Sequence, residues 1–242
     1  MKELYAELFN KCRGLDGFCE SSNFVAITGD LDHQQQRFML IGRACNGWDD
    51  FSLNLDDCDE YSNIADIEFY DRNRWGWIKE YRGALYSGHT DPPTYCVSQK
   101  PFWDYSKSIW QCISGKQAKG KWMENIAWSN LYKVSPAVSG NPEEEYKQVE
   151  LDTCKKILIR ELELIKPTHI FMPVGYYGWF EDFKDIFSDV KYLGSNVSRG
   201  KNKNTIYVEA TAKWKDAKVV ISCRPEYRDK ESFVEAVSKA FL

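Results

Sequence analysis

Three short apolar runs of this chain end abruptly in polar or turn residues, and they constrain the fold more than any other feature. The runs and their breaks read FMLIGRACNGW (38–48), NIAWSNLYKVSP (125–136) and VVISCRPEY (219–227). Short continuous apolar runs are typical of strands buried on both faces of a parallel sheet. Ligands bind beyond the carboxyl ends of such strands. The sequence therefore predicts an α/β fold with a binding site at these breaks.

Helical patterns alternate with the strand-like runs. The best-marked helix has Asn141 as its N-cap and Pro142 at its first position, and Pro167 ends it before a strand at 169–172. Asp229 can cap a helix that closes the chain. Further segments have weaker patterns. Helices are expected near 2–12, 102–114 and 176–187, and a strand at 205–210.

Alternation of strands and helices predicts a three-layer α/β/α sandwich with a central, mainly parallel sheet. Each apolar run is joined to the next by a segment long enough for a crossover helix. The strands that end at Gly42, Asn130, Met172 and Ser222 are therefore expected to be parallel neighbours.

Length and composition bound the class of protein. No linker divides the 242 residues convincingly, so we expect a single domain over 1–242, with an aromatic-rich elaboration at about 49–101. The net charge of −4 argues against coating of nucleic acid by bulk electrostatics and leaves room for a local contact. No apolar run is long enough to cross a membrane and the N-terminus mixes charges into a helical pattern, which together predict a cytoplasmic protein.

The eight cysteines show no C-x-x-C pair of the kind that metal sites favour. Several of them, Cys112, Cys154 and Cys223 among them, lie in apolar segments. Buried free thiols are the expected state, and no metal or other cofactor is predicted.

Taken in order, these segments resemble the uracil-DNA glycosylase superfamily. The most specific similarity joins NIAWSNLYKVSP to the stretch NPEEEYKQVELDTCKKILIRELELIKPTHIFMPVGYYG, which starts at Asn141. In the superfamily's iron–sulfur branch these stretches hold a strand with a base-recognising Asn, a helix and the next strand. GRACNGW then corresponds to the first motif loop and SCRPEYR to the last. The resemblance implies a three-layer α/β/α fold and binding of a base flipped out of DNA.

The chain departs from that superfamily at positions that carry its chemistry. The first loop usually has an acid or amide two residues after its glycine, to handle the hydrolytic water, and here that position is Ala44. The last motif is usually His-Pro-Ser, and here Arg224 replaces the His. Val134 stands where the iron–sulfur branch has a cysteine, although Cys154 matches another ligand position. Two positions that carry the superfamily's chemistry are thus changed, and the cysteine ligands that a cluster needs are not all present.

Four residues are predicted to bind the base. Asn130, at a strand end, can present an amide and a carbonyl to the edge of a pyrimidine, although a loop-fixing hydrogen bond is the alternative role. Trp48 and Phe51 can stack on the base, or only cover the core. Gly42 opens the first loop, next to the base.

Three residues are candidates for catalysis. Asn46 can position a water, or can simply favour an Asn-Gly turn, and Asp49 can assist the water's attack or belong to a solvated acidic loop. Arg224 can stabilise the departing base anion, or form a structural ion pair.

Three functions follow as hypotheses. The first is a uracil-DNA-glycosylase-like protein that binds a flipped base in DNA and hydrolyses its N-glycosidic bond. The second is a non-catalytic relative that binds a nucleobase or nucleic acid. The third is an α/β scaffold whose aromatic-rich segment serves a protein partner.

Overall fold

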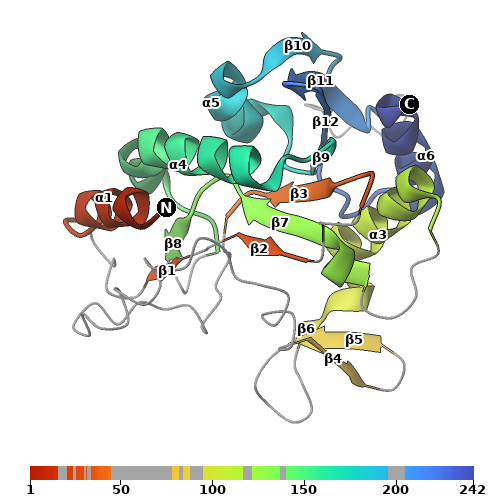
Figure 1. Ribbon diagram of the computed structural model, residues 1–242, viewed down its shortest axis with the longest axis horizontal. Coiled ribbons are helices and arrows are strands. Elements are labelled where there is room, and N and C mark those ends of the chain that lie inside the picture. Colours follow the sequence, from red (N-terminus) through yellow and green to blue (C-terminus); the bar gives the residue numbers. More distant parts are fainter. Residues whose placement is uncertain are drawn as a thin grey trace. The chain divides into compact units, whose positions relative to one another are not determined.

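The computed structural model describes residues 1–15, 21–23, 26–29, 31, 34–44, 78–81, 84–87, 95–116, 122–136, 140–195 and 205–242. Within these ranges the largest sheet has seven strands, ordered β10-β11-β12-β9-β3-β7-β2 (Figure 1). Their bounds are β10 Ser188–Tyr192, β11 Val208–Trp214, β12 Ala217–Ser222, β9 His169–Met172, β3 Phe38–Gly42, β7 Ile126–Asn130 and β2 Ile27–Thr28.

The four strands expected to be neighbours, β12, β9, β3 and β7, are adjacent in this order, which confirms their predicted adjacency. β9 is parallel both to β12, with His169 opposite Lys218, and to β3, with His169 opposite Phe38. Beyond β12 the sheet changes direction, because β11–β12 and β10–β11 are antiparallel pairs. The protein is therefore an α/β protein with a mixed, partly parallel sheet packed against helices.

Burial follows the apolar runs of the sequence. Every residue of β3 and of β7 is buried, whereas β10, at the edge, has mostly exposed side chains. Strands in the middle of the sheet are covered on both faces, and their sequences are therefore continuously apolar. The strand at the open edge is exposed to solvent, and its sequence is polar.

Packing divides the chain into two compact units. Unit 1 comprises residues 1–27, 41–70 and 128–166, and unit 2 comprises 28–40, 71–127 and 167–242. The divisions at 27/28, 40/41 and 127/128 fall inside β2, β3 and β7. Each unit is thus assembled from three separate stretches of the chain.

In unit 1, helix α1 (Lys2–Cys12) packs on helix α4 (Glu144–Ile165). The Glu7 carboxylate on α1 joins the two helices, because its Oε1 accepts from Lys156 Nζ at 2.9 Å and from Thr153 Oγ1 at 3.0 Å. Unit 1 also contains two short strands. They are β1 (Ser21–Asn23) and β8 (Val134–Pro136), which pair antiparallel.

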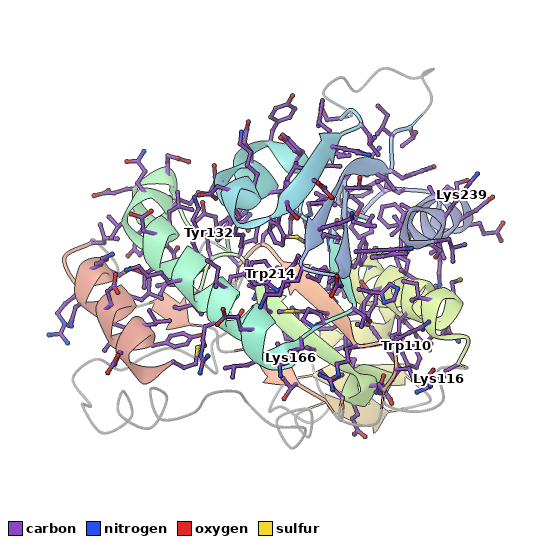
Figure 2. The ribbon with its side chains drawn as sticks, turned by 45° about the horizontal axis from the view of Figure 1, so that its top comes forward. Trp110, Lys116, Tyr132, Lys166, Trp214 and Lys239 are labelled. Carbon is purple, nitrogen blue, oxygen red and sulfur yellow. The ribbon has the colours of Figure 1, made fainter. Side chains whose placement is uncertain are left out.

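Helix α4 begins later than the sequence signals indicate. Its N-cap is Glu143 rather than Asn141, and Pro142 is buried before the first turn. The predicted end is right: Ile165 is the last helical residue, and Lys166 follows in the left-handed region with φ 50°. Tyr132 lies against the early turns of α4, with Lys147 Nζ 5.9 Å from its ring centroid (Figure 2).

In unit 2, helices α3 (Pro101–Ser114) and α6 (Lys230–Phe241) pack on each other. Aromatic rings fill the interior: Phe38 of β3 lies 6.5 Å from Phe171 of β9, centroid to centroid, and 6.3 Å from Phe241 of α6. Trp110 of α3, labelled in Figure 2, lies 6.1 Å from Trp122, centroid to centroid. Much of the aromatic content of the sequence therefore belongs to the core.

Another segment of unit 2 differs from expectation. Residues 176–187 form an irregular π turn (Tyr176–Phe180), a short helix α5 (Glu181–Phe183) and a 3₁₀ turn (Lys184–Ile186) instead of one helix. The described part of the elaboration predicted at 49–101 contains a small antiparallel sheet, and the rest of it lies outside the described residues. Its strands are β4 (Ile78–Tyr81), β5 (Ala84–Ser87) and β6 (Tyr95–Cys96).

No helix in the described ranges combines the length and the apolar character needed to cross a membrane.

Candidate functional site

Two of the predicted site residues, Gly42 and Asn130, lie at the ends of neighbouring strands in unit 1. The Leu131 N–H donates to the Gly42 carbonyl at 2.9 Å, and the Tyr132 N–H donates to the Arg43 carbonyl at 3.0 Å. Successive donors thus meet successive acceptors, so the segments leaving β7 and β3 run in the same direction. The fold therefore brings the first and second motif segments together, as the strand ends predict.

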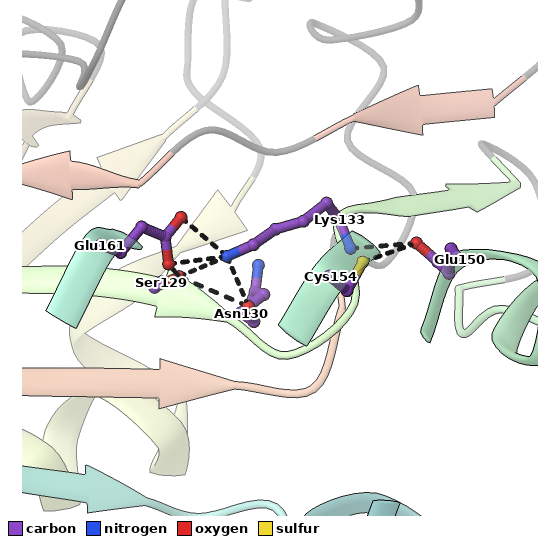
Figure 3. A network of polar contacts seen from close by, with 6 residues as sticks. All are labelled: Ser129, Asn130, Lys133, Glu150, Cys154 and Glu161. Atoms are coloured by element: carbon purple, nitrogen blue, oxygen red, sulfur yellow. Dashed lines mark hydrogen bonds and ion pairs between the residues drawn. The ribbon is translucent and has the colours of Figure 1, made fainter. Parts of the chain in front are cut away.

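Asn130 places an amide at this edge. The residue is 2% exposed, and among the described residues its Nδ2 has no hydrogen-bond partner (Figure 3). Most buried polar atoms in folded proteins are satisfied, so a buried amide nitrogen without a partner requires an explanation. A ligand that accepts a hydrogen bond from Nδ2 would supply one.

Lys133 fixes the backbone next to this amide. Its Nζ donates to the Asn130 backbone oxygen at 2.7 Å, to Ser129 Oγ at 2.7 Å and to the two Glu161 oxygens at 2.8 and 2.9 Å (Figure 3). Lys133 and Glu161 form an ion pair whose side chains are both 0% exposed. Ser129 Oγ in turn donates to Glu161 Oε2 at 2.6 Å. The charges are thus paired inside a hydrogen-bonded cluster, as burial requires.

A second carboxylate, Glu150, holds the segment that follows. Its Oε2 accepts from the backbone N–H of Lys133 at 3.2 Å, from that of Val134 at 3.0 Å and from Cys154 Sγ at 3.2 Å. Burial raises the pKa of the Glu150 carboxyl to about 8, against the lowering effect of these donors. Glu150 therefore carries a proton at neutral pH.

The thiols near Glu150 have raised pKa values as well. Burial, and then the proximity of Glu150, raises the pKa of Cys12 to about 12 and that of Cys154 well above its usual range. An iron–sulfur cluster needs thiolate ligands. Val134 has no ligand atom and the Cys154 thiol is bonded to Glu150, so the described residues do not fit the cluster of the branch that the sequence resembles. Nor do the described ranges contain a group of three His, Cys, Asp or Glu side chains suited to a metal ion.

Arg224 belongs to unit 2, in the loop between β12 and α6. Its guanidinium makes a bidentate ion pair with Glu226, with Nη2 2.7 Å from Oε1 and Nε 3.0 Å from Oε2, and its side chain is 50% exposed. The same loop also bonds to helix α3, because the Tyr105 hydroxyl donates to the Arg228 carbonyl at 2.7 Å. Arg224 thus forms a structural ion pair, which is the alternative to a role in stabilising the base anion.

The other four predicted site residues, Asn46, Trp48, Asp49 and Phe51, lie outside the described residues. Ala44, at the position where the resemblance asks for an acid or amide, is described and partly buried. A methyl group cannot polarise a water molecule. Any activation of water would have to come from other residues.

Sequence reasoning missed Lys133, Glu150 and Glu161, although a signal was present. Glu150 and Glu161 are eleven residues apart, close to three turns of an α-helix, so they share one face of α4. That face is the apolar stripe of Tyr146, Cys154, Ile157 and its neighbours, all buried. Acidic residues within an apolar stripe predict buried carboxylates that need partners.

No protein-family profile matches this chain. No curated protein matches it at a significant level.

Proposed function

We propose that this protein binds a base flipped out of a DNA strand, and that Asn130 reads the edge of that base. The proposal includes the finer architecture that the resemblance implies, a three-layer α/β/α sandwich of the uracil-DNA glycosylase type. Support comes from the order of the motif segments along the chain, and from the adjacency of β12, β9, β3 and β7.

The observation that carries the proposal is the unsatisfied amide of Asn130. An Asn side chain offers donors on Nδ2 and an acceptor on Oδ1, which together match the donor and acceptor edge of a pyrimidine. Nδ2 is buried and without a described partner, at the carboxyl end of a central strand where α/β proteins place their ligands. A base carbonyl at this position would accept a hydrogen bond from it.

Hydrolysis of the N-glycosidic bond is the reaction that such a site would serve. Its transition state has oxocarbenium character, so a carboxylate near the sugar and a cation near the leaving base both lower the barrier. In this proposal Asn46 and Asp49 act on the water, and Trp48 and Phe51 stack on the base beside Gly42. Arg224 keeps the role that the resemblance gives it, a cation for the departing base anion. No cofactor takes part.

A second candidate function, binding of a nucleobase without cleavage, is favoured by two observations. Ala44 cannot activate water, and the Arg224 guanidinium already binds Glu226 in a bidentate ion pair. Both positions that carry the chemistry in the resembled superfamily are thus changed in identity.

Release of free base separates the two candidates. The full chain is incubated with single-stranded and mismatched duplex oligonucleotides that carry uracil, hypoxanthine or xanthine, and released base is quantified. Asn130→Ala is expected to lose roughly 1 to 3 kcal/mol of base discrimination, because it leaves the base edge unpaired. Arg224→Ala is expected to slow cleavage without unfolding the protein.

Asn125→Ala is the matched control. Asn125 lies just before the other end of β7, where its Oδ1 accepts from Gln34 Nε2 at 3.2 Å. This variant should bind and cleave as the wild type does. Binding without base release, dependent on Asn130, would support the second candidate. A protein that neither binds nor cleaves would contradict both and favour the scaffold hypothesis.

A further inference from the structure

We infer that Lys133 is a positioning residue, which holds Asn130 in the geometry that reads the base. The inference rests on the proposed function and extends it to a residue that touches no ligand. Lys133 follows Asn130 by three residues, and its Nζ reaches back to the Asn130 backbone oxygen at 2.7 Å. A side-chain ammonium thus closes the turn at the end of β7, in the place where a backbone N–H usually does.

The ammonium is itself held from helix α4. Both Glu161 oxygens accept from Lys133 Nζ, and Ser129 Oγ bonds both to Nζ and to Glu161 Oε2. These contacts occupy the residue before Asn130 and the backbone oxygen of Asn130 itself. The Asn130 side chain therefore projects from a backbone that is fixed on both sides of the turn.

Glu150 fixes the far end of the same segment, through the backbone N–H groups of Lys133 and Val134. Residues 129–134 are thus bracketed by two buried acidic side chains, Glu150 and Glu161, on one face of α4 (Figure 3). A recognition group gains specificity when the residues around it lock its orientation before the ligand arrives.

Stability alone does not account for this arrangement. A buried ion pair stabilises a fold no more than well-packed apolar residues of similar volume do, because both charges lose their hydration. Removal of one partner, however, leaves the other charge buried and unpaired. The two effects can be separated by comparing single and double variants.

The test uses the double variant Lys133→Met/Glu161→Met in the full chain, since the single variant Lys133→Met would leave Glu161 buried and unpaired. Binding is measured to an oligonucleotide with one 2′-fluorinated deoxyuridine, whose sugar resists oxocarbenium formation, and to the same strand with an abasic analogue. The ratio of the two dissociation constants reports recognition of the base alone. The matched control is Arg160→Gln/Glu163→Gln, an exposed pair on α4 with side chains 46% and 44% exposed.

The double variant is expected to keep the wild-type circular dichroism and melting temperature, and to lose base preference by roughly tenfold, with abasic binding unchanged. The control pair should change neither quantity. An unchanged base preference in the folded double variant would overturn the positioning role and leave the proposed function standing. Equally weakened binding of the base-containing and the abasic strand would have the same two consequences. An unfolded double variant would assign the pair to stability and overturn it too. A wild type without base preference, or with one that Asn130→Ala does not alter, would remove both proposals.

Discussion

Glu150 couples protonation to folding at a single residue. Its pKa is about 8 in the folded protein, because burial penalises the charged carboxylate, and near 4.5 when the chain is unfolded. Between these two values the folded state keeps a proton that the unfolded state has released. The free energy of unfolding should therefore fall as pH rises from about 4.5 to about 8, by on the order of 5 kcal/mol at most.

Glu150→Gln should remove this dependence, because an amide does not titrate in this range. Urea unfolding is measured at intervals between pH 5 and pH 9. The free energy of unfolding of Glu150→Gln, relative to that of the wild type, should rise with pH up to about pH 8. Glu145→Gln, at an exposed position on the same helix, should follow the wild-type curve. Parallel curves for wild type and Glu150→Gln would contradict the prediction.

Helix α1 depends on a carboxylate with the opposite behaviour. Hydrogen bonds from Lys11, Lys156 and Thr153 lower the pKa of Glu7 from 4.5 to about 2. Glu7 therefore stabilises the packing of α1 on α4 fully above pH 4.5, and this contribution is lost as pH falls toward 2. Glu7→Gln should flatten the acid limb between these values, measured by thermal unfolding. A steep acid limb retained in Glu7→Gln would show that other carboxylates cause it.

At position 29, just after strand β2, the close approach of a second backbone segment favours glycine. The Gly29 N–H donates to the Ile126 carbonyl at 2.9 Å, and a Cβ on Gly29 would lie 2.1 Å from the Glu124 carbonyl oxygen. Backbone atoms cannot move away from the added Cβ as the end of a flexible side chain could. Gly29→Ala should cost about 1 to 3 kcal/mol in the free energy of unfolding, measured with urea. Gly14→Ala, with no atom within 4 Å of its added Cβ, is the control and should cost far less.

The elements that sequence predicts well here are those determined by local burial. β3 and β7 were predictable because their apolar runs are continuous, and α6 because Asp229 accepts a hydrogen bond from the Ser232 N–H, as an N-cap should. β11 begins at Val208, later than the apolar pattern indicates, because its register is set by pairing with β12. Tertiary pairing of this kind leaves no mark within a short window of sequence.

The candidate site likewise has one part that the sequence predicts and another part that it does not. The meeting of Gly42 and Asn130 follows from strand order, which the pattern of apolar runs predicts. The contacts of Lys133 do not follow, because a lysine is normally expected at the surface and only the fold shows that two carboxylates of α4 enclose its segment.

At the scale of the whole molecule, net charge bears on the DNA binding that we propose. A net charge of −4 argues against a broad positive surface and leaves room for a local basic contact. The logarithm of the binding constant for a single strand should fall with the logarithm of salt concentration with a slope no steeper than about −3, as expected for about four phosphate contacts. Fluorescence anisotropy between 50 and 300 mM salt measures the slope. A value several-fold steeper would indicate an extended basic face and contradict the prediction.

The packing of α1 on α4 sets the order in which this protein can mature on the ribosome. The two helices are separated by roughly 130 residues of chain. At about 5 to 20 residues per second, synthesis of that stretch takes about 7 to 26 seconds. During this interval Tyr5, Leu8 and Phe9 of α1, all buried in the folded protein, are in the nascent chain without the helix that covers them. Helix α1 can therefore reach its buried state only after α4 has been synthesised.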